Sequence, residues 1–446
     1  MTTQLDTDDI KGLVLGLALP SMVAQFVSVL YSIVDRMYIG NIQGIGETAL
    51  AGVGVCGPIL TMISAFASLI GIGGGPLVSI RLGQKRDKDA EAVLSDCFIF
   101  LSLISIIVML ISFLLKDSLL WWFGASETVF PYADEYMSWY LSGTIFALLS
   151  TGMNQFIICQ GYSGTAMRSV IIGAVMNIVL DPIFIFVLGM NVKGAAIATV
   201  ISQLGSCIYV LSFLFRRSRL RIHIRKPSMR NFVNVCRLGL TPFLIIAFDN
   251  IMLISLNSMI TKYGGGAEGD MLLSCNTILQ SFMLIITMPL GGITGGTQTI
   301  LGYNYGARRP DKIRLAQKYI AMLGFVFCLI MFIIARTVPD LFIRIFTRDA
   351  EYVELTKQIM RVYTLGVLAL PFQYTIVDGF TGMGIFKYAF PLSAWRKFIY
   401  FACVFLIPPI WGVEAIFLCE PLSDIFGTLV STAAYFTLGM KLLRRI

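Results

Sequence analysis

The segment VIIGAVMNIVLDPIFIFVLGM, residues 170–190, is apolar along most of its length and carries one carboxylate, Asp181, but no basic residue. A run of roughly 20 apolar residues is long enough to cross the hydrocarbon core of a bilayer as a helix. A charge near the middle of such a helix costs roughly 2.5–3.5 kcal/mol on insertion scales. The segment therefore predicts a membrane-spanning helix whose carboxylate has a function.

The rest of the chain is also rich in apolar residues and poor in charged ones. Of its 446 residues, 57% are hydrophobic and 13% are charged, whereas soluble domains have about 25% charged residues. The hydrophobic residues form long runs that do not alternate with polar residues, as the strands of a membrane barrel would. The N-terminal MTTQLDTDDIKG is polar and acidic, and the apolar run after it is too long for a cleavable signal peptide. We therefore expect an all-α polytopic membrane protein.

Hydropathy predicts about twelve transmembrane helices in two six-helix lobes. The expected ranges are 13–37, 50–80, 92–114, 136–158, 168–190, 194–214, 237–261, 273–301, 315–338, 356–377, 388–409 and 413–438. We assign helices one to six to an N-lobe over 1–215, a basic cytoplasmic connector to 216–235, and helices seven to twelve to a C-lobe over 236–446.

The basic residues of the loops predict the orientation of these helices. One set of loops carries RLGQKRDK (81–88), RRSRLRIHIRK (216–226), ARRPDKIR (307–314), Arg396 with Lys397, and the terminal KLLRRI. Because positively charged loops stay inside, this set and both termini are expected to be cytoplasmic, in a bacterial inner membrane. The connector is expected to face anionic lipid rather than a nucleic acid.

The chain offers little for a cofactor or for catalysis. Its nine cysteines have no CxxC spacing, and His223 is its one histidine. GIGGG (71–75) is not followed by the GK[ST] of a nucleotide-binding loop. Small residues of this kind permit close helix packing, as we also expect for GGITGG (291–296). We expect no enzyme activity and no cofactor, so that any transport must be driven by an ion gradient.

The two halves of the sequence resemble each other. LGQKRDK (82–88) matches YGARRPD (305–311), GYSG (161–164) matches GFTG (379–382), and VKGAAIATVISQ (192–203) matches VEAIFLCEPLSD (413–424). Because each half holds an even number of helices, both halves insert the same way up. Bundles with such repeats place the substrate between two lobes and alternate access by rocking.

Over nearly its full length, the chain resembles the multidrug and toxic compound extrusion (MATE) family of antiporters. Within that family it is most similar to the bacterial MepA-like subgroup. The segments that carry the resemblance are 17–40 (LALPSMVAQFVSVLYSIVDRMYIG), 71–90 (GIGGGPLVSIRLGQKRDKDA), 177–203 and 295–316 (GGTQTILGYNYGARRPDKIRLA). The resemblance implies a twelve-helix MATE/MOP-type fold and the export of lipophilic or cationic drugs or metabolites in exchange for Na⁺ or H⁺. The expected partners are those compounds and the lipid bilayer, with a functional monomer and no nucleic acid.

Charged and polar residues inside the N-lobe helices form the first candidate site. Asn177 lies four residues before Asp181, so both side chains share one helix face. Asp35 can point inward while Arg36 reaches the interface, although an interfacial Asp35–Arg36 pair is the alternative. Thr199 is expected at the depth of Asp181 across a short turn. The resemblance implies that these four residues form the N-lobe cation site, where the oxygen ligands suit Na⁺ and the two carboxylates suit H⁺ equally.

The repeat leaves the corresponding C-lobe positions, near Asn257, Ser258 and 400–402, without a carboxylate. The cation site should therefore belong to the N-lobe alone. Asp249, Glu420 and Asp424 are other acids inside C-lobe helices. They can attract a cationic drug, take part in coupling, or pair structurally with polar groups such as Gln280 and Asn250.

Further candidates are polar or flexible side chains that could line a substrate cavity, and prolines that could act as hinges. The cavity candidates are Gln25, Tyr31, Asn154, Gln155, Asp249, Gln280, Met283, Met288, Glu420 and Asp424. The hinge candidates are Pro20 and Pro182, since a proline inside a helix removes a backbone hydrogen bond.

Two rival functions make different demands on the sequence. A lipid-linked oligosaccharide flippase of the same superfamily would favour cationic residues in the cavity to hold pyrophosphate, and intramembrane arginine and lysine are scarce. An intramembrane aspartyl protease would use Asp35 and Asp181, but no GxGD motif occurs and the duplicated body is left unexplained. Both rivals are therefore less favoured than an antiporter.

Overall fold

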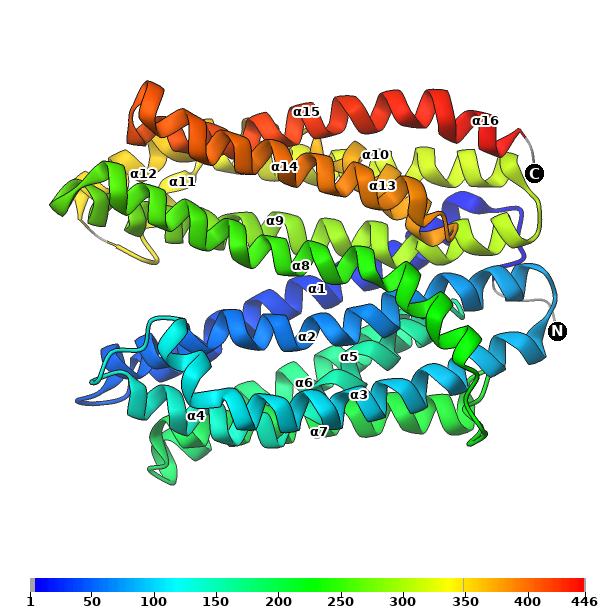
Figure 1. The fold of residues 1–446 in the computed structure, drawn as a ribbon, viewed down its shortest axis with the longest axis horizontal. Coiled ribbons are helices and arrows are strands. Elements are labelled where there is room, and N and C mark those ends of the chain that lie inside the picture. The colour runs from blue at the N-terminus through cyan, green and yellow to red at the C-terminus, as the bar shows by residue number, and fades with distance from the viewer. Residues whose placement is uncertain (1–4, 348, 445–446) are drawn as a thin grey trace. The chain divides into compact units, whose positions relative to one another are not determined.

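The computed structural model describes residues 5–347 and 349–444, and this part of the chain is helical, without a strand. Figure 1 shows the helices as long rods. The first half contains α1 (Ile10–Gly40), α2 (Gly46–Gly83), α3 (Asp87–Trp122), α4 (Phe130–Ser142), α5 (Thr144–Ile158), α6 (Ser163–Pro182), the π turn η1 (Ile183–Val187), α7 (Asn191–Ser212) and the π turn η2 (Phe213–Arg217). The predicted all-α class is confirmed.

The second half repeats this order. It contains α8 (Met229–Gly264), α9 (Gly266–Gly306), α10 (Pro310–Thr337), α11 (Pro339–Ile343), α12 (Ala350–Tyr363), the 3₁₀ turn η3 (Thr364–Gly366), α13 (Leu370–Gly382), α14 (Phe386–Trp411), the 3₁₀ turn η4 (Val413–Leu418), α15 (Cys419–Ala434), the π turn η5 (Tyr435–Gly439) and α16 (Met440–Leu443).

Each of the twelve predicted spans overlaps one helix or one broken helix. Among the described residues, nine helices are long and apolar enough to cross a membrane, and α4 with α5, bent by 58°, makes a tenth. The two remaining predicted spans are interrupted. The span predicted at 356–377 is broken by η3 between α12 and α13, and the span at 413–438 consists of α15 between a 3₁₀ and a π turn.

The chain divides into two compact units, one of Met1–Thr7 with Leu19–Ile246 and the other of Asp8–Ala18 with Ala247–Ile446. The later boundary lies inside α8, beyond residue 236 where the sequence placed the start of the C-lobe. The earlier boundary lies inside α1, two residues before Pro20. The first turns of α1 therefore group with the second unit, although the sequence assigned all of 1–215 to the N-lobe.

Corresponding helices of the two units pack in the same pairs. In the first unit α2 packs against α3, α4 and α5, and α7 packs against α5 and α6. In the second unit α9 packs against α10, α12 and α13, and α15 packs against α13 and α14. The turns also match, because Lys85 and Arg308 have left-handed φ angles of 59° and 57°. The structural repeat thus follows the sequence repeat.

One pairing predicted from the repeat was wrong. The sequence matched GYSG (161–164) with GFTG (379–382), but GFTG lies at the end of α13. The turn before α6 has its left-handed glycine at Gly161 (φ 92°), and the turn before α14 has it at Gly384 (φ 74°). The structural match is therefore between Gly161 and Gly384, five residues further on. GYSG and GFTG are similar in sequence but do not occupy equivalent positions. Gly161 and Gly384 do, because each turn needs a residue with positive φ, which favours glycine.

The glycines of GIGGG allow helices to approach closely, as predicted. A Cβ on Gly73 would lie 2.4 Å from the carbonyl oxygen of Val235, and a Cβ on Gly239 would lie 1.8 Å from that of Leu69. The backbone of α2 therefore touches the first part of α8. The same interpretation does not hold for Gly291 and Gly295 of GGITGG, since nothing lies within 4 Å of a Cβ at either residue.

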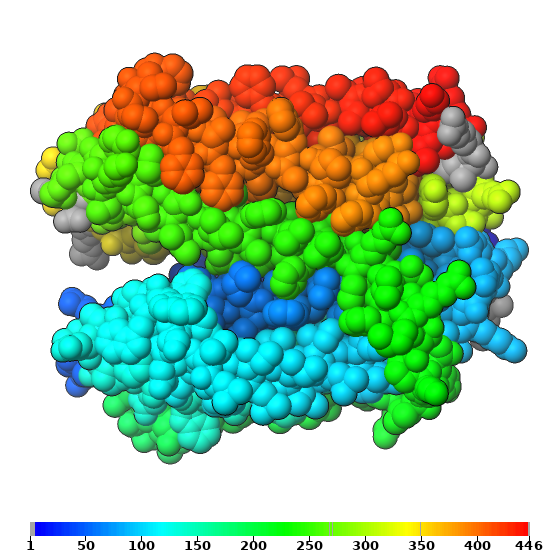
Figure 2. All heavy atoms as spheres, viewed as in Figure 1, coloured from blue at the N-terminus to red at the C-terminus, as the bar shows by residue number. Residues whose placement is uncertain are grey.

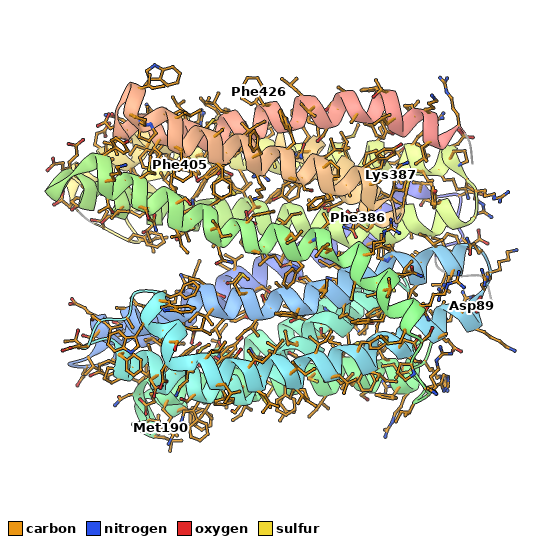
Figure 3. All side chains as sticks on the ribbon, viewed as in Figure 1. Asp89, Met190, Phe386, Lys387, Phe405 and Phe426 are labelled. Atoms are coloured by element: carbon orange, nitrogen blue, oxygen red, sulfur yellow. The ribbon has the colours of Figure 1, made fainter. Side chains whose placement is uncertain are left out.

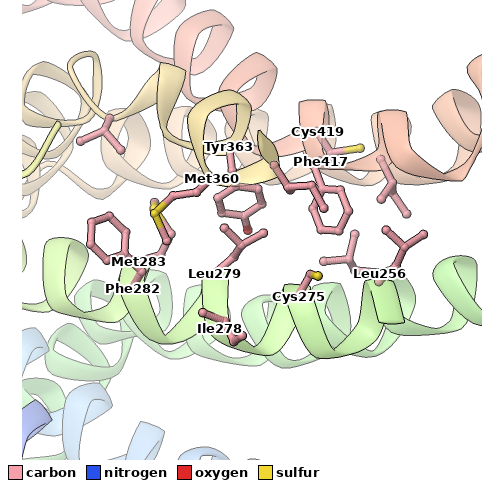
Figure 4. Close-up of a cluster of buried hydrophobic side chains, with 14 of the residues drawn as sticks. Leu256, Cys275, Ile278, Leu279, Phe282, Met283, Met360, Tyr363, Phe417 and Cys419 are labelled. Carbon is pink, nitrogen blue, oxygen red and sulfur yellow. The ribbon is translucent and has the colours of Figure 1, made fainter. Parts of the chain in front are cut away.

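Apolar side chains both fill the units and cover their outside. In the second unit, a buried cluster joins α8, α9, α12, η4 and the start of α15 (Figure 4), with Leu256, Leu279 and Phe417 each at most 1% exposed. Large apolar side chains are also exposed. Phe405 and Phe426, labelled in Figure 3, are 50% and 51% exposed. Extensive exposed apolar surface of this kind is expected where lipid is the solvent.

Candidate functional site

The first candidate site is built around Asp181, which lies at the end of α6. Its side chain is fully buried, and Asn177 one turn earlier is 2% exposed. The amide nitrogen of Asn177 donates a hydrogen bond to Asp181 Oδ1 at 3.1 Å. The two residues therefore share the helix face that the sequence predicted for them.

Thr199 of α7 lies beside this pair. The Asn177 amide also donates to Thr199 Oγ1 at 3.4 Å, while that hydroxyl donates to the carbonyl oxygen of Ala195 at 3.0 Å. Gly189, in the turn between η1 and α7, and Asn191, the first residue of α7, both have left-handed φ. This tight turn makes α6 and α7 packed neighbours, so that Asn177 and Thr199 meet.

Asp35 of α1 completes the group. Its carboxyl group lies within hydrogen-bonding reach of the Asp181 carboxyl group. Asp35 is half-buried, whereas the neighbouring Arg36 is exposed. This placement favours an inward-facing Asp35 over an interfacial Asp35–Arg36 pair. The structure thus brings together Asp35, Asn177, Asp181 and Thr199 within the first unit.

This group has buried acceptor oxygens that receive no hydrogen bond. Within the described residues, the buried oxygens Asp35 Oδ1, Asn177 Oδ1 and Asp181 Oδ2 have no hydrogen-bond partner. All three atoms are acceptors, and buried acceptors without a partner are costly. Two carboxylates in contact also repel each other unless a proton or a cation lies between them. What the group can bind is therefore a proton or a cation that prefers oxygen ligands.

The two hinge candidates have different surroundings. Pro182 is the last residue of α6, and the π turn η1 follows it directly. In this turn the amide of Leu188 donates to the carbonyl oxygen of Ile183. The helix therefore ends in a π turn directly beside Asp181. Pro20 lies inside α1 next to the boundary between the two units.

The three candidate acids of the second unit, Asp249, Glu420 and Asp424, each form an ion pair with a basic residue of α14. Arg396 Nε donates to Asp424 Oδ1 at 2.9 Å, and Arg396 Nη2 donates to Glu420 Oε1 at 3.2 Å. Lys397 forms an ion pair with Asp249. Neither basic residue was predicted as a partner, because both were expected in cytoplasmic loops.

The loop assignment of Arg396 and Lys397 needs correction. Both lie inside α14, with side chains only 13% and 9% exposed. They are therefore intramembrane basic residues, which the comparison with a flippase had treated as scarce. Because three carboxylates surround them, they offer no free positive charge for a pyrophosphate. The signal that could have found them is the i, i+4 spacing of Glu420 and Asp424 on the next helix.

The remaining candidates do not form one group. Asn154 accepts a hydrogen bond from Ser169 at 3.1 Å and so joins α5 to α6. Gln280 donates to the hydroxyl of Tyr363 at 2.9 Å, and Met283 is buried in the core cluster of Figure 4. These three side chains stabilise contacts inside their own units. Gln25, Tyr31 and Gln155 are half-buried, and Met288 is 39% exposed.

Known proteins share this architecture. A family model described as MatE matches residues 20–183 and 245–406. The chain is 24% identical over 372 residues to the multidrug export protein MepA of Staphylococcus aureus (strain MSSA476). The matched region covers 82% of this chain and 81% of that protein. MepA of Staphylococcus haemolyticus (strain JCSC1435) is 26% identical over 376 residues, covering 82% and 80%.

Solved structures agree with the fold. The crystal structure of MATE in complex with MaD3S has a TM-score of 0.91 at 23% identity and covers 99% of both chains. A MATE family transporter of the MOP superfamily in an outward-facing conformation has a TM-score of 0.90 at 22% identity, covering 100% of this chain and 99% of the other. The predicted twelve-helix fold is thereby confirmed.

Proposed function

Because the chain belongs to the MatE family of membrane transporters, we propose that it is an antiporter that exports lipophilic and cationic compounds in exchange for Na⁺ or H⁺. The multidrug export proteins among its relatives support the substrate class. The observation that carries the coupling mechanism is the set of three unpaired buried acceptors on Asp35, Asn177 and Asp181. A transported ion would satisfy those acceptors while it is bound and leave them unpaired when it departs.

The site would bind its ion through oxygen atoms of α1, α6 and α7. Asp35 and Asp181 would supply negative charge, and Asn177 Oδ1 and Thr199 Oγ1 would complete the ligands of a Na⁺ ion. A proton would need only the two carboxyl groups, which are already within hydrogen-bonding reach. In either case the bound charge removes the repulsion between the carboxylates. The segment 170–190 would then lack a basic residue because the positive charge that balances Asp181 has to be able to leave.

Ion binding would act on conformation through the two prolines. Asp181 is adjacent to Pro182 and to the π turn that follows, so a change in its contact with Asp35 would act on a weakly bonded part of the helix. Asp35 lies on the part of α1 that follows Pro20. Bending of α1 at Pro20 would change the angle between the part of the helix before Pro20 and the part after it. This bend would release the exported compound outward. Return of the ion to the inside would reset the transporter.

The three C-lobe acids would divide into two roles. Glu420 and Asp424 are held by Arg396 and serve mainly to neutralise it. Asp249 is different, because its side chain is 50% exposed although its partner Lys397 is buried. Asp249 is therefore the C-lobe acid that a cationic compound could reach. The protein would act as a monomer in the bacterial inner membrane, with both termini in the cytoplasm.

Transport from proteoliposomes tests this function directly. The purified protein would be reconstituted with a fluorescent lipophilic cation inside, and Na⁺ and pH gradients would be imposed separately. We expect efflux above that of protein-free vesicles under at least one inward ion gradient, and its collapse when an ionophore removes that gradient. Equal efflux with and without either gradient, from protein shown to be folded, would contradict an ion-coupled antiporter.

A further inference from the structure

The connector between the two halves is bound along the first turns of α3. Figure 2 shows its atoms, in green, against this end of α3. Every second residue of the connector meets every fourth residue of the helix, and two extended residues advance about 6.6 Å while four helical residues advance about 6 Å. The contacts are Arg219 Nη2 to Asp87 at 2.6 Å, the Arg221 amide to Glu91 at 3.3 Å and the His223 amide to Ser95 at 3.0 Å.

Arg225, two residues after His223, makes a bidentate contact with Asp96, which directly follows Ser95. Its guanidinium donates to both oxygens of Asp96, at 3.2 and 3.3 Å, and the Asp96 side chain is fully buried. Asn231, at the start of α8, donates to the same carboxylate at 2.7 Å. The arginines of the connector, expected to face lipid, are thus partly engaged by the acids of α3.

A pocket of about 380 Å³ opens beside this contact, between α2, α3, the connector and the first turn of α8. Four arginines line it, Arg81, Arg86, Arg225 and Arg230, together with one acid, Asp89. Asp89 is labelled in Figure 3. Such a volume lies within the range of sites for small ligands, roughly 300–1,000 Å³.

The charges around the pocket are not balanced. Asp89 pairs with Arg86 at 2.6 Å, and both side chains are exposed by about half or more. Arg81 uses two of its donors, to the carbonyl oxygen of Asp89 and to Asn231, but a guanidinium has five N–H groups. In the part of the chain that the structure describes, Arg230 is exposed and makes no hydrogen bond or ion pair. The pocket therefore presents positive charge and unused donors.

We propose that this pocket binds the phosphate group of an anionic phospholipid. Guanidinium groups from α2, the turn before α3, the connector and α8 can surround the several oxygens of one phosphate. A carboxylate has only two oxygens and would leave more of these donors unused. The pocket lies at the ends of helices that are long enough to span a membrane, where basic pockets between helices bind anionic lipid head groups. Bound there, the phosphate would tie the first turn of α8 to α2 and α3. A soluble phosphate compound offers the same chemistry and has to be distinguished by experiment.

Native mass spectrometry of the purified protein can test this site. The protein would be titrated with phosphatidylglycerol, with phosphatidylcholine and, separately, with inorganic phosphate followed by thermal unfolding. The test variant is Arg230→Gln, whose side chain has no structural bond to lose. The matched control is Arg221→Gln, which removes the same charge from an exposed arginine of the connector that does not line the pocket. An Arg86→Gln/Arg230→Gln double variant removes two of the four guanidiniums.

We expect the wild-type protein to bind phosphatidylglycerol about tenfold more tightly than phosphatidylcholine, since its net anionic charge adds to the phosphate contacts. Arg230→Gln should weaken that binding about tenfold, and the double variant further, while Arg221→Gln leaves it within about twofold. A different result would keep the phosphate site but overturn its lipid ligand. In that case millimolar inorganic phosphate would stabilise the wild type but not Arg230→Gln, and the wild type would show no preference for phosphatidylglycerol. Equal lipid binding by Arg230→Gln and Arg221→Gln, without an effect of phosphate, would overturn the site.

Discussion

Arg396 Nε lies 2.9 Å from Asp424 Oδ1 inside the second unit, and the Asp424 side chain is completely buried. The same guanidinium reaches Glu420, one turn earlier on α15. A single basic residue of α14 therefore contacts two acids of the next helix. Charges buried in this way are strongly destabilising when one partner is removed, since the remaining charge is left uncompensated.

Replacing Arg396 by Met should therefore destabilise the second unit. We expect a loss of about 3–5 kcal/mol, the cost of breaking a buried pair, which thermal unfolding in detergent would report as a lower midpoint. Arg344→Met removes an exposed arginine of the same unit and should leave the midpoint nearly unchanged. Adding Asp424→Leu and Glu420→Gln to Arg396→Met should recover stability, because no unpaired charge then remains. An Arg396→Met protein as stable as its Arg344→Met counterpart would show that the pair contributes little.

Asp181→Asn should abolish ion-coupled efflux while the protein still folds. The amide keeps the size of the side chain and can accept from Asn177, but it carries no charge for a proton or cation to neutralise. The variant should also lose any rise in unfolding temperature that Na⁺ or acid pH gives the wild type, because a ligand stabilises only the state it binds. Asp117→Asn, at a side chain 72% exposed, makes the same chemical change outside the site. Wild-type efflux by Asp181→Asn would remove the site from the mechanism.

Thr199→Val should distinguish the two coupling ions. Valine keeps the shape of threonine but lacks the hydroxyl that lies 3.4 Å from the Asn177 amide. Na⁺ needs several oxygen ligands, so its half-saturating concentration should rise roughly tenfold, about 1.4 kcal/mol. A proton needs only the Asp35–Asp181 pair, so proton-driven efflux should change by less than about twofold. Efflux would be measured under each gradient, and Thr199→Ser should restore Na⁺-driven transport. An equal loss under both gradients would indicate a structural role for Thr199.

Three members of the N-lobe group were predictable because local rules place them, whereas Asp35 of α1 was included through its depth and the family resemblance. The i, i+4 spacing of Asn177 and Asp181 fixes one face of α6, and a short turn sets Thr199 opposite. The C-lobe pairs were not predictable in the same way, since Arg396 meets Asp424 only through the packing of α14 on α15. The arginine pocket was missed for a similar reason. Its arginines come from 81–86 and 225–230, and the charge count of each segment alone predicted only a basic loop.

The approach of α2 to α8 gives a final prediction about the glycines of GIGGG. Gly73→Ala would place a Cβ 2.4 Å from the carbonyl oxygen of Val235 and close to the backbone of Gly239. Because backbone rather than a flexible side chain is in the way, the helices must separate, at a cost of about 1–3 kcal/mol or more. The unfolding midpoint in detergent should therefore fall.

Gly57→Ala is the matched control for this prediction, because it adds the same methyl group to the same helix where nothing lies within 4 Å of the new Cβ. Alanine also forms helix more readily than glycine, by up to about 1 kcal/mol in soluble helices, so Gly57→Ala should leave the unfolding midpoint unchanged or raise it. Opposite signs at the two positions would establish that Gly73 is required for contact with α8. If Gly73→Ala were as stable as Gly57→Ala, α2 and α8 would have to lie further apart than the structure places them.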